Sequence, residues 1–223
     1  MQRLVLFFLL LVCARAQEWK PLFNGIDLQG WELKGEGDWQ VLAGGILIGH
    51  AVSEEKAPFG PWPVSLTQKQ YHNWRQAQSW LYTTREFGEF NLRLEYLTPS
   101  GGNGGVSIRD NTRGRFAYGA NPDFDRTPAR NGYEIQILNG VKTKYPSGSI
   151  YLFAPAAFGH EKKNDWNTLE IESRNAGIRV KLNGHDVAAH PGDPARPKTG
   201  PIGLQLHDRF SVILFRNIQI RER

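Results

Sequence analysis

Glu134 is one of the side chains of this sequence that could donate or accept a proton in a reaction. It lies in the run GYEIQI (132–137). Side chains of a strand alternate between two faces, so Glu134 and Gln136 would share one side and the apolar residues the other. Three further runs repeat this pattern, and their polar side chains would include Glu95, Arg109, Gln205 and His207. A sheet face that carries carboxylate, guanidinium, imidazole and amide groups is typical of a site for a polar ligand.

Short strands joined by glycine and proline turns dominate the sequence. The strand-like runs are 39–42 and 46–48, 90–96, 105–109, 132–138, 166–172, 177–182, 185–187, 202–207 and 212–220. Asn183-Gly184 joins two of them and favours a tight hairpin of type I′. Only residues 68–80 could hold a short helix. This pattern predicts an all-β chain folded as an antiparallel sandwich or barrel.

Three long segments would form loops, at residues 53–79, 111–131 and 190–201. Long ordered loops on a compact domain are often functional. The first loop contains Trp62 and Trp74, which are candidates for stacking on a sugar ring. The loops could equally well do no more than cover sheet edges.

The first sixteen residues have the pattern of a secretory signal peptide. A basic start precedes the apolar run 4–12, and Ala14-Arg15-Ala16 fits a cleavage site. We therefore expect cleavage after Ala16, one domain over 17–223, and a secreted or periplasmic protein of the bacterial envelope with no stable membrane insertion. The single cysteine, Cys13, lies in the leader, so the mature domain would have neither disulfides nor thiolate metal ligands. The net charge of +5 is scattered, which argues against nucleic-acid binding.

A set of short segments, taken in order, resembles the 3-keto-disaccharide hydrolase family. The segments are LFNGIDLQGW (22–31), FGEFNLRLEY (87–96), GNGGVSIR (102–109), GYEIQIL (132–138), GSIY (148–151), DWN (165–167), LNG (182–184), GLQLH (203–207) and FRNI (215–218). Gly104 replaces the family's usual serine, and the 53–79 insertion is longer than expected. The resemblance implies the concanavalin A-like lectin/glucanase jelly roll and a carbohydrate substrate.

The number of carboxylates argues against conventional glycosidase chemistry. Retaining and inverting enzymes need two carboxyl groups, about 5–5.5 Å or about 6.5–9.5 Å apart. Glucanases of this fold carry several on one strand, whereas this strand offers Glu134 followed by Gln136 and Leu138. Glu95 could supply the second from a neighbouring strand.

The resemblance implies a substrate already oxidised to a ketone at C3. The ketone acidifies the C2 hydrogen, so a base can remove this proton, the C1 substituent leaves by elimination, and water then adds. One base, one enolate stabiliser and one proton donor suffice. Glu134 or His207 could be the base, Arg109 the enolate stabiliser, and Glu95 or His207 the acid. Side chains available to bind the sugar would be Glu95, Asn103, Gln136, Tyr151, Gln205, Trp62 and Trp74.

Other interpretations remain open. Glu134 or Glu95 could instead form a structural ion pair with Arg109, and the chain could be a non-catalytic, lectin-like carbohydrate-binding module, because one fold serves both roles. No cofactor is expected, although Glu134, Glu95 and His207 could together hold a divalent ion that polarises the ketone. The sequence does not predict an oligomeric state.

Overall fold

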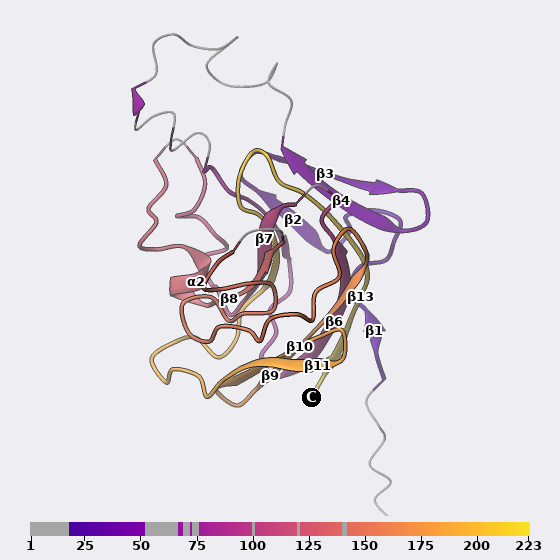
Figure 1. Ribbon diagram of the computed structural model, residues 1–223, viewed down its shortest axis with the longest axis vertical. Helices are drawn as coiled ribbons and strands as arrows, with labels where there is room; N and C mark the ends of the chain where they lie inside the picture. Colours follow the sequence, from indigo (N-terminus) through magenta and orange to yellow (C-terminus); the bar gives the residue numbers. More distant parts are fainter. Residues whose placement is uncertain are drawn as a thin grey trace, which may run out of the picture.

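The computed structural model is a sandwich of two antiparallel sheets, which confirms the expected fold class (Figure 1). It describes residues 18–51, 67, 68, 72, 76–99, 101–119, 121–139 and 142–223. The expected signal peptide and most of the 53–79 insertion lie outside these residues. In the described part of the chain, no helix is long and apolar enough to cross a membrane.

The larger sheet has eight strands and the smaller sheet five. The path of the larger sheet is β11 (His185–His190), β10 (Gly177–Leu182), β9 (Asn167–Arg174), β6 (Phe90–Leu97), β13 (Val212–Glu222), β4 (Ile46–Ala51) and β3 (Gly37–Leu42), with β1 (Lys20–Pro21) also paired to β13. The order of the smaller sheet is β2 (Trp31–Lys34), β5 (Ser79–Thr83), β12 (Ile202–Leu206), β7 (Asn103–Ile108) and β8 (Tyr133–Leu138). One short helix, α2 (Pro128–Asn131), precedes β8.

The core lies between the sheets and is built from alternate residues of each strand. In β6 and β9 every second residue is buried and the residues between them are half-buried or, at Arg174, exposed, as the period of a strand requires. Ile135 of β8 and Leu204 of β12 pack in the same buried cluster as Leu92 of β6. One face of the smaller sheet is therefore turned into the core, and the side chains on its other face are available for a site.

The two hairpins predicted from sequence are present. Asn183 and Gly184 have φ values of 51° and 85°, as a type I′ turn between β10 and β11 requires. The β3–β4 hairpin turns at residues 43–45. Three strands were not predicted: the two-residue β1, β2, and β5, which begins at Ser79 inside the range expected to be helical. The expectation of a helix as far as residue 80 is therefore wrong.

Candidate functional site

The strand register places the polar side chains of the smaller sheet in two rows on its outer face. Because antiparallel partners point to the same side, each row crosses the sheet. One row runs Glu32, Tyr82, Gly203, Ser107 and Glu134. The next row runs Lys34, Trp80, Gln205, Gly105 and Gln136. Glu134, Gln136 and Gln205, three of the residues predicted for the site, therefore lie on one face.

Two glycines make room for large side chains within these rows. A Cβ on Gly203 would lie 2.4 Å from a ring carbon of Tyr82. A Cβ on Gly105 would lie 2.8 Å from the carbonyl oxygen of Ile135, 3.1 Å from Cγ of Glu134 and 3.3 Å from Oε1 of Gln205. Glu134 and Gln205 therefore converge over the bare backbone of Gly105, which lies between their strands.

Glu134 is a buried carboxylic acid whose pKa is shifted into the neutral range. The residue is 4% exposed. Burial raises the pKa of Glu134 to about 7, and the charge of His207 and a hydrogen bond from Gln205 lower it only in part. A carboxyl group with a pKa near neutrality can both take and return a proton, which is what a general base in a cleft needs.

His207 follows β12 and has a carboxylate beside its ring. Its Nδ1 is buried without a hydrogen-bond partner among the described residues and lies 3.7 Å from Oδ2 of Asp208. Burial raises the pKa of Asp208, but contacts with His207, the Phe210 N–H and the Ser211 hydroxyl outweigh it, so the pKa is lowered. A charged Asp208 favours the tautomer of His207 with its proton on Nδ1.

Asp208 also links His207 to Gln136 on β8, through Ser211 and Asn103. Ser211 Oγ donates to Asp208 Oδ1 at 3.0 Å and accepts the N–H of Asn103 at 2.8 Å. Asn103 Oδ1 in turn accepts a hydrogen bond of 3.2 Å from Nε2 of Gln136. The predicted residues Asn103, Gln136 and His207 are therefore held in one chain of contacts.

Two polar atoms on this face are buried without a hydrogen-bond partner in the described part of the chain. They are the hydroxyl oxygen of Ser107, opposite Glu134 in the register, and Oε1 of Gln205. The amide nitrogen of Gln205 donates to Gln78 at 3.2 Å, which fixes the orientation of the amide. Buried polar groups are normally paired, so such atoms beside a carboxyl with a raised pKa indicate a ligand site.

Residues of β5 and of the loop after β7 form one side of the site, and the sequence did not predict them there. Trp80 and Tyr82 stack with centroids 5.5 Å apart and are fully buried. Tyr82 donates to Asp110 at 3.0 Å, and Asp110 also accepts from the hydroxyl and N–H of Thr112 and from the Gly114 N–H. Asp110 thus anchors the loop against the sheet. The continuous run of aromatic and apolar residues 80–82 was the signal available for β5.

Arg109 does not lie with Glu134, so the expected enolate-stabilising role and the alternative ion pair with Glu134 are both corrected. Its φ of 61° breaks the alternation at the end of β7. The guanidinium donates to the carbonyls of Ala176 and Asn175 at 2.7 and 3.0 Å and to Ser173 Oγ at 2.8 Å. Arg109 is 1% exposed and holds the β9–β10 turn of the larger sheet in place.

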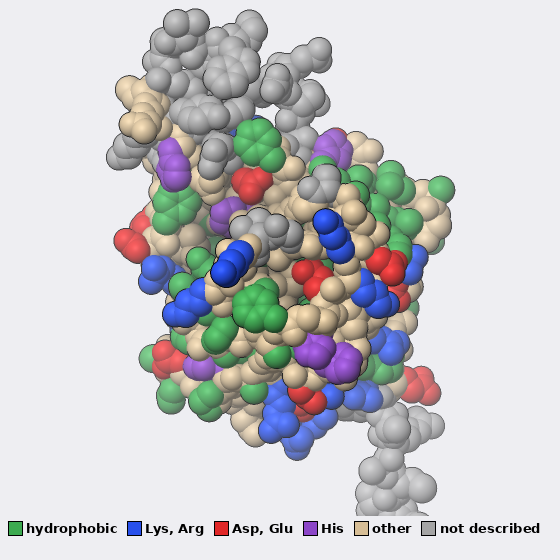
Figure 2. Space-filling view, in the orientation of Figure 1, with side chains coloured by type: hydrophobic (Ala, Val, Ile, Leu, Met, Phe, Trp, Pro, Cys, Tyr) green, Lys and Arg blue, Asp and Glu red, His purple; other side chains and the backbone are tan. Residues whose placement is uncertain are grey.

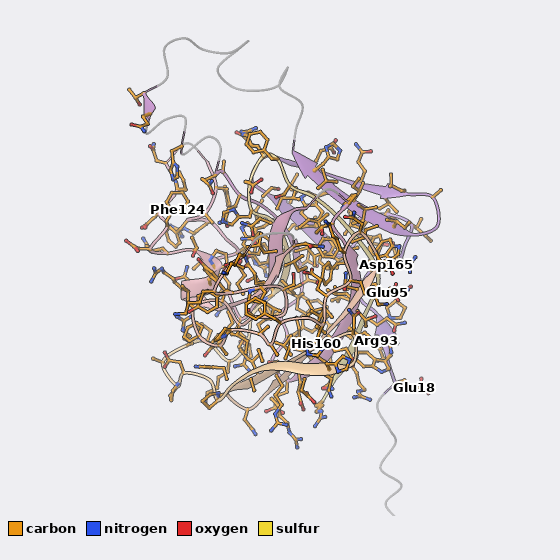
Figure 3. All side chains as sticks on the ribbon, in the orientation of Figure 1. Glu18, Arg93, Glu95, Phe124, His160 and Asp165 are labelled. Atoms are coloured by element: carbon orange, nitrogen blue, oxygen red, sulfur yellow. The ribbon has the colours of Figure 1, made fainter. Side chains whose placement is uncertain are left out.

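Glu95 lies on β6 of the larger sheet, so its expected role as acid or sugar ligand is also corrected. Figure 3 labels it beside β13, away from β8. Arg216 donates to it at 2.6 Å and Asn217 at 3.1 Å. The alternative divalent-ion site of Glu134, Glu95 and His207 is therefore not assembled. No group of three or more His, Cys, Asp and Glu residues in the described ranges could hold a metal ion.

The remaining predicted residues lie at the margin of the site or outside the described ranges. Tyr151 donates its N–H to the carbonyl of Glu134 at 2.9 Å, while its ring packs edge-on against Tyr145 with centroids 5.2 Å apart. Trp62 and Trp74 lie outside the described residues, so their predicted stacking on a sugar stays a prediction.

Comparison with known proteins agrees with a carbohydrate-related chain. A family model described as a 3-keto-alpha-glucoside-1,2-lyase-like domain matches residues 18–221. A protein of Parabacteroides distasonis ATCC 8503, solved as a candidate glycosyl hydrolase, is 26% identical, with 93% of this chain and 100% of the other covered and a TM-score of 0.62. No curated protein matches the sequence significantly.

Two more distant structures share the fold. The carbohydrate-binding module CBM66 of Bacillus subtilis is 16% identical, with 86% of this chain and 96% of the other covered and a TM-score of 0.51. A Bacillus subtilis protein of unknown function with a galectin-like fold is 12% identical, with 92% and 94% covered and a TM-score of 0.56. The jelly-roll architecture is therefore common to binding modules and to candidate hydrolases.

Proposed function

The chain belongs to the family of 3-keto-alpha-glucoside-1,2-lyase-like domains, and from this premise we propose that it cleaves the C1 bond of 3-keto-glycosides, with Glu134 as the base. The observation that carries the proposal is the buried carboxyl of Glu134 on the outer face of the smaller sheet, with a pKa of about 7. A ketone at C3 makes the C2 hydrogen acidic enough for such a base. A conventional double displacement would need a second carboxylate at a defined separation. Glu95 belongs to the other sheet, and Asp110 is engaged by Tyr82, Thr112 and Gly114.

The first step is removal of the C2 proton. Glu134 takes the proton, and the electron pair of the C2–H bond becomes an enolate whose charge rests on the C3 oxygen. The Ser107 hydroxyl lies directly opposite Glu134 in the register and is the donor available to that oxygen. It takes the place in the proposal that Arg109 had in the sequence-based hypothesis.

The second step breaks the C1–O bond. The enolate electrons re-form the C3 ketone and a C1–C2 double bond, and the leaving oxygen takes a proton from His207. Water then adds its hydroxyl to C1 and gives its proton to His207, while Glu134 returns a proton to C2. One water is consumed, and the products are the 3-keto-sugar and the free alcohol. The carboxylate of Asp208, 3.7 Å from Nδ1, orients the ring for this proton transfer.

A chromogenic substrate pair tests this function. The protein is incubated with a 3-keto-glucoside that carries a nitrophenyl leaving group and, in parallel, with the unoxidised glucoside. The proposal expects release from the keto compound alone. Release from the unoxidised glucoside would instead indicate a glucanase, and binding of both sugars without release from either would indicate a lectin-like module.

A further inference from the structure

A second pocket lies on the larger sheet, at the end where β9 turns into β10. Its volume is about 600 Å³. The lining residues come from the β9–β10 hairpin and from the end of β11, and they are Glu172, Arg174, Asn175, Ala176, Gly177, Ile178, Arg179, Ala189, His190 and Pro191. We name it the β9–β10 pocket. It shares no lining residue with the Glu134 face, which belongs to the other sheet.

The two arginines of the β9–β10 pocket are unusual in this molecule. Within the described part of the chain, Arg174 and Arg179 have no ion pair, side-chain hydrogen bond or ring contact. Every other described arginine has a carboxylate, a carbonyl, an amide or an aromatic ring as a partner. Figure 2 shows Lys and Arg side chains gathered at the lower end of the view, where Figure 1 draws β9, β10 and β11. Two unpaired guanidinium groups on one pocket favour an anionic ligand.

The wall of the β9–β10 pocket is fixed from inside the protein. The buried guanidinium of Arg109 donates to the carbonyls of Asn175 and Ala176, which are lining residues. Arg109 also brings a third positive charge beneath the wall. The turn is therefore a rigid, electropositive surface, as a preorganised anion site requires.

The acidic groups near the β9–β10 pocket are already engaged. Glu172 lines it but lies 3.6 Å from a guanidinium nitrogen of Arg223. Glu89 accepts the N–H of Asn175 at 2.8 Å. In addition, His190 Nδ1 accepts the N–H of Gly192 at 2.9 Å, so the proton of the neutral ring is on Nε2, which is a donor. Positive charge and donors thus prevail in the pocket.

We propose that the β9–β10 pocket binds a saccharide that carries a carboxylate or sulfate group. A guanidinium can pair with such a planar or tetrahedral anion through two hydrogen bonds. The volume exceeds what a simple ion needs and lies in the range of small-molecule sites. Ala189 and Pro191 offer apolar surface for the C–H face of a sugar ring. The site is separate from catalysis and would attach the protein to an anionic glycan.

Titration calorimetry tests this proposal with four ligands: digalacturonate, a sulfated disaccharide, cellobiose and inorganic sulfate. The two anionic disaccharides are expected to bind, and the tighter of them identifies the anionic group. Arg174→Gln/Arg179→Gln should weaken binding about tenfold or more. Lys162→Gln/Lys163→Gln is the matched control, because it removes the same charge from two exposed residues before β9 and should bind as the wild type does.

Four results would overturn the proposal. They are unchanged binding by the arginine variant, equal weakening in the lysine control, binding of cellobiose or inorganic sulfate as tight as that of the anionic disaccharides, and no saturation at about 10 mM ligand. Thermal melting verifies that the variants are folded. Turnover of a 3-keto-glucoside is expected to be unchanged in the arginine variant, so failure of this site and failure of the Glu134 proposal give different results.

Discussion

Glu134 and Gln205 meet over Gly105, with Cγ of the first and Oε1 of the second 3.1 and 3.3 Å from the point that a Cβ would occupy. The glycine is thus part of the site although it has no side chain. Because Gly105 on β7 has no side chain, the carboxyl of Glu134 on β8 and the amide of Gln205 on β12 can face the same small volume. The buried hydroxyl of Ser107 lies directly opposite Glu134.

The substitution Gly105→Ala should displace Glu134. The new methyl group would lie 2.8 Å from the Ile135 carbonyl oxygen, so the strands or the carboxyl must move. We expect a loss of about 1–3 kcal/mol in the free energy of unfolding and a large fall in kcat. Gly177→Ala is the matched control, because its Cβ meets only ordinary contacts of 3.5 Å or more and should leave kcat unchanged. Equal kcat values for the two variants would contradict this account.

The raised pKa of Glu134 predicts a specific dependence of stability on pH. Its pKa is about 7 in the folded state against 4.5 for an unperturbed glutamate. The stabilisation from the protonated group is complete below about pH 4.5 and is lost as pH rises through about 7, by about 3 kcal/mol. Glu134→Gln should remove this dependence, so its stability relative to the wild type should rise between these pH values. Urea titrations across this range measure it, and parallel curves for both proteins would contradict the prediction.

Asp208→Asn should slow turnover without weakening substrate binding. The carboxylate lies 3.7 Å from Nδ1 of His207 and accepts hydrogen bonds from the Phe210 N–H and the Ser211 hydroxyl. An uncharged amide would fix the orientation and the tautomer of the ring less well. We expect kcat to fall about tenfold or more, with KM unchanged. Asp38→Asn changes a second Asp–His pair, with His50 on the larger sheet, and should have no effect. A change in KM alone would assign Asp208 to binding.

Arg109→Gln should affect folding and not chemistry. The substitution removes hydrogen bonds to two carbonyls and a hydroxyl that hold the β9–β10 turn. Since hydrogen bonds to a charged donor contribute about 1.5–3 kcal/mol each, we expect a loss of about 3 kcal/mol or more. The turnover per folded molecule should be retained. Arg85→Gln, which removes an exposed ion pair with Glu222, is the control and should cost under about 1 kcal/mol. A stable Arg109→Gln protein without turnover would restore the catalytic hypothesis.

The alternation of residue types was sufficient to predict the sandwich and to place Glu134, Gln136 and Gln205 on one face. It could not assign Glu95 to the correct sheet. Periodicity shows which side chains of a strand face away from the core, but it does not show to which of the two sheets the strand belongs. The position of Arg109 depends on a positive φ that is uncommon outside glycine. Asp110 lies in an irregular segment, so only the three-dimensional structure brings it to Tyr82. Asp208 directly follows His207 in the sequence, but strand alternation gives no reason to expect the two side chains to meet.

The most direct test of the account follows the hydrogen on C2. A 3-keto-glucoside labelled with deuterium at C2 and the unlabelled compound are compared in single-turnover measurements, and release of the leaving group gives the ratio of the two rates. Glu134→Gln and, as a matched control, Glu95→Gln are measured beside the wild type. The account predicts slower release from the deuterated compound with the wild type and with Glu95→Gln, and a fall in turnover of about 10²–10⁴-fold with Glu134→Gln. Equal rates for the two compounds, or full turnover by Glu134→Gln, would contradict it.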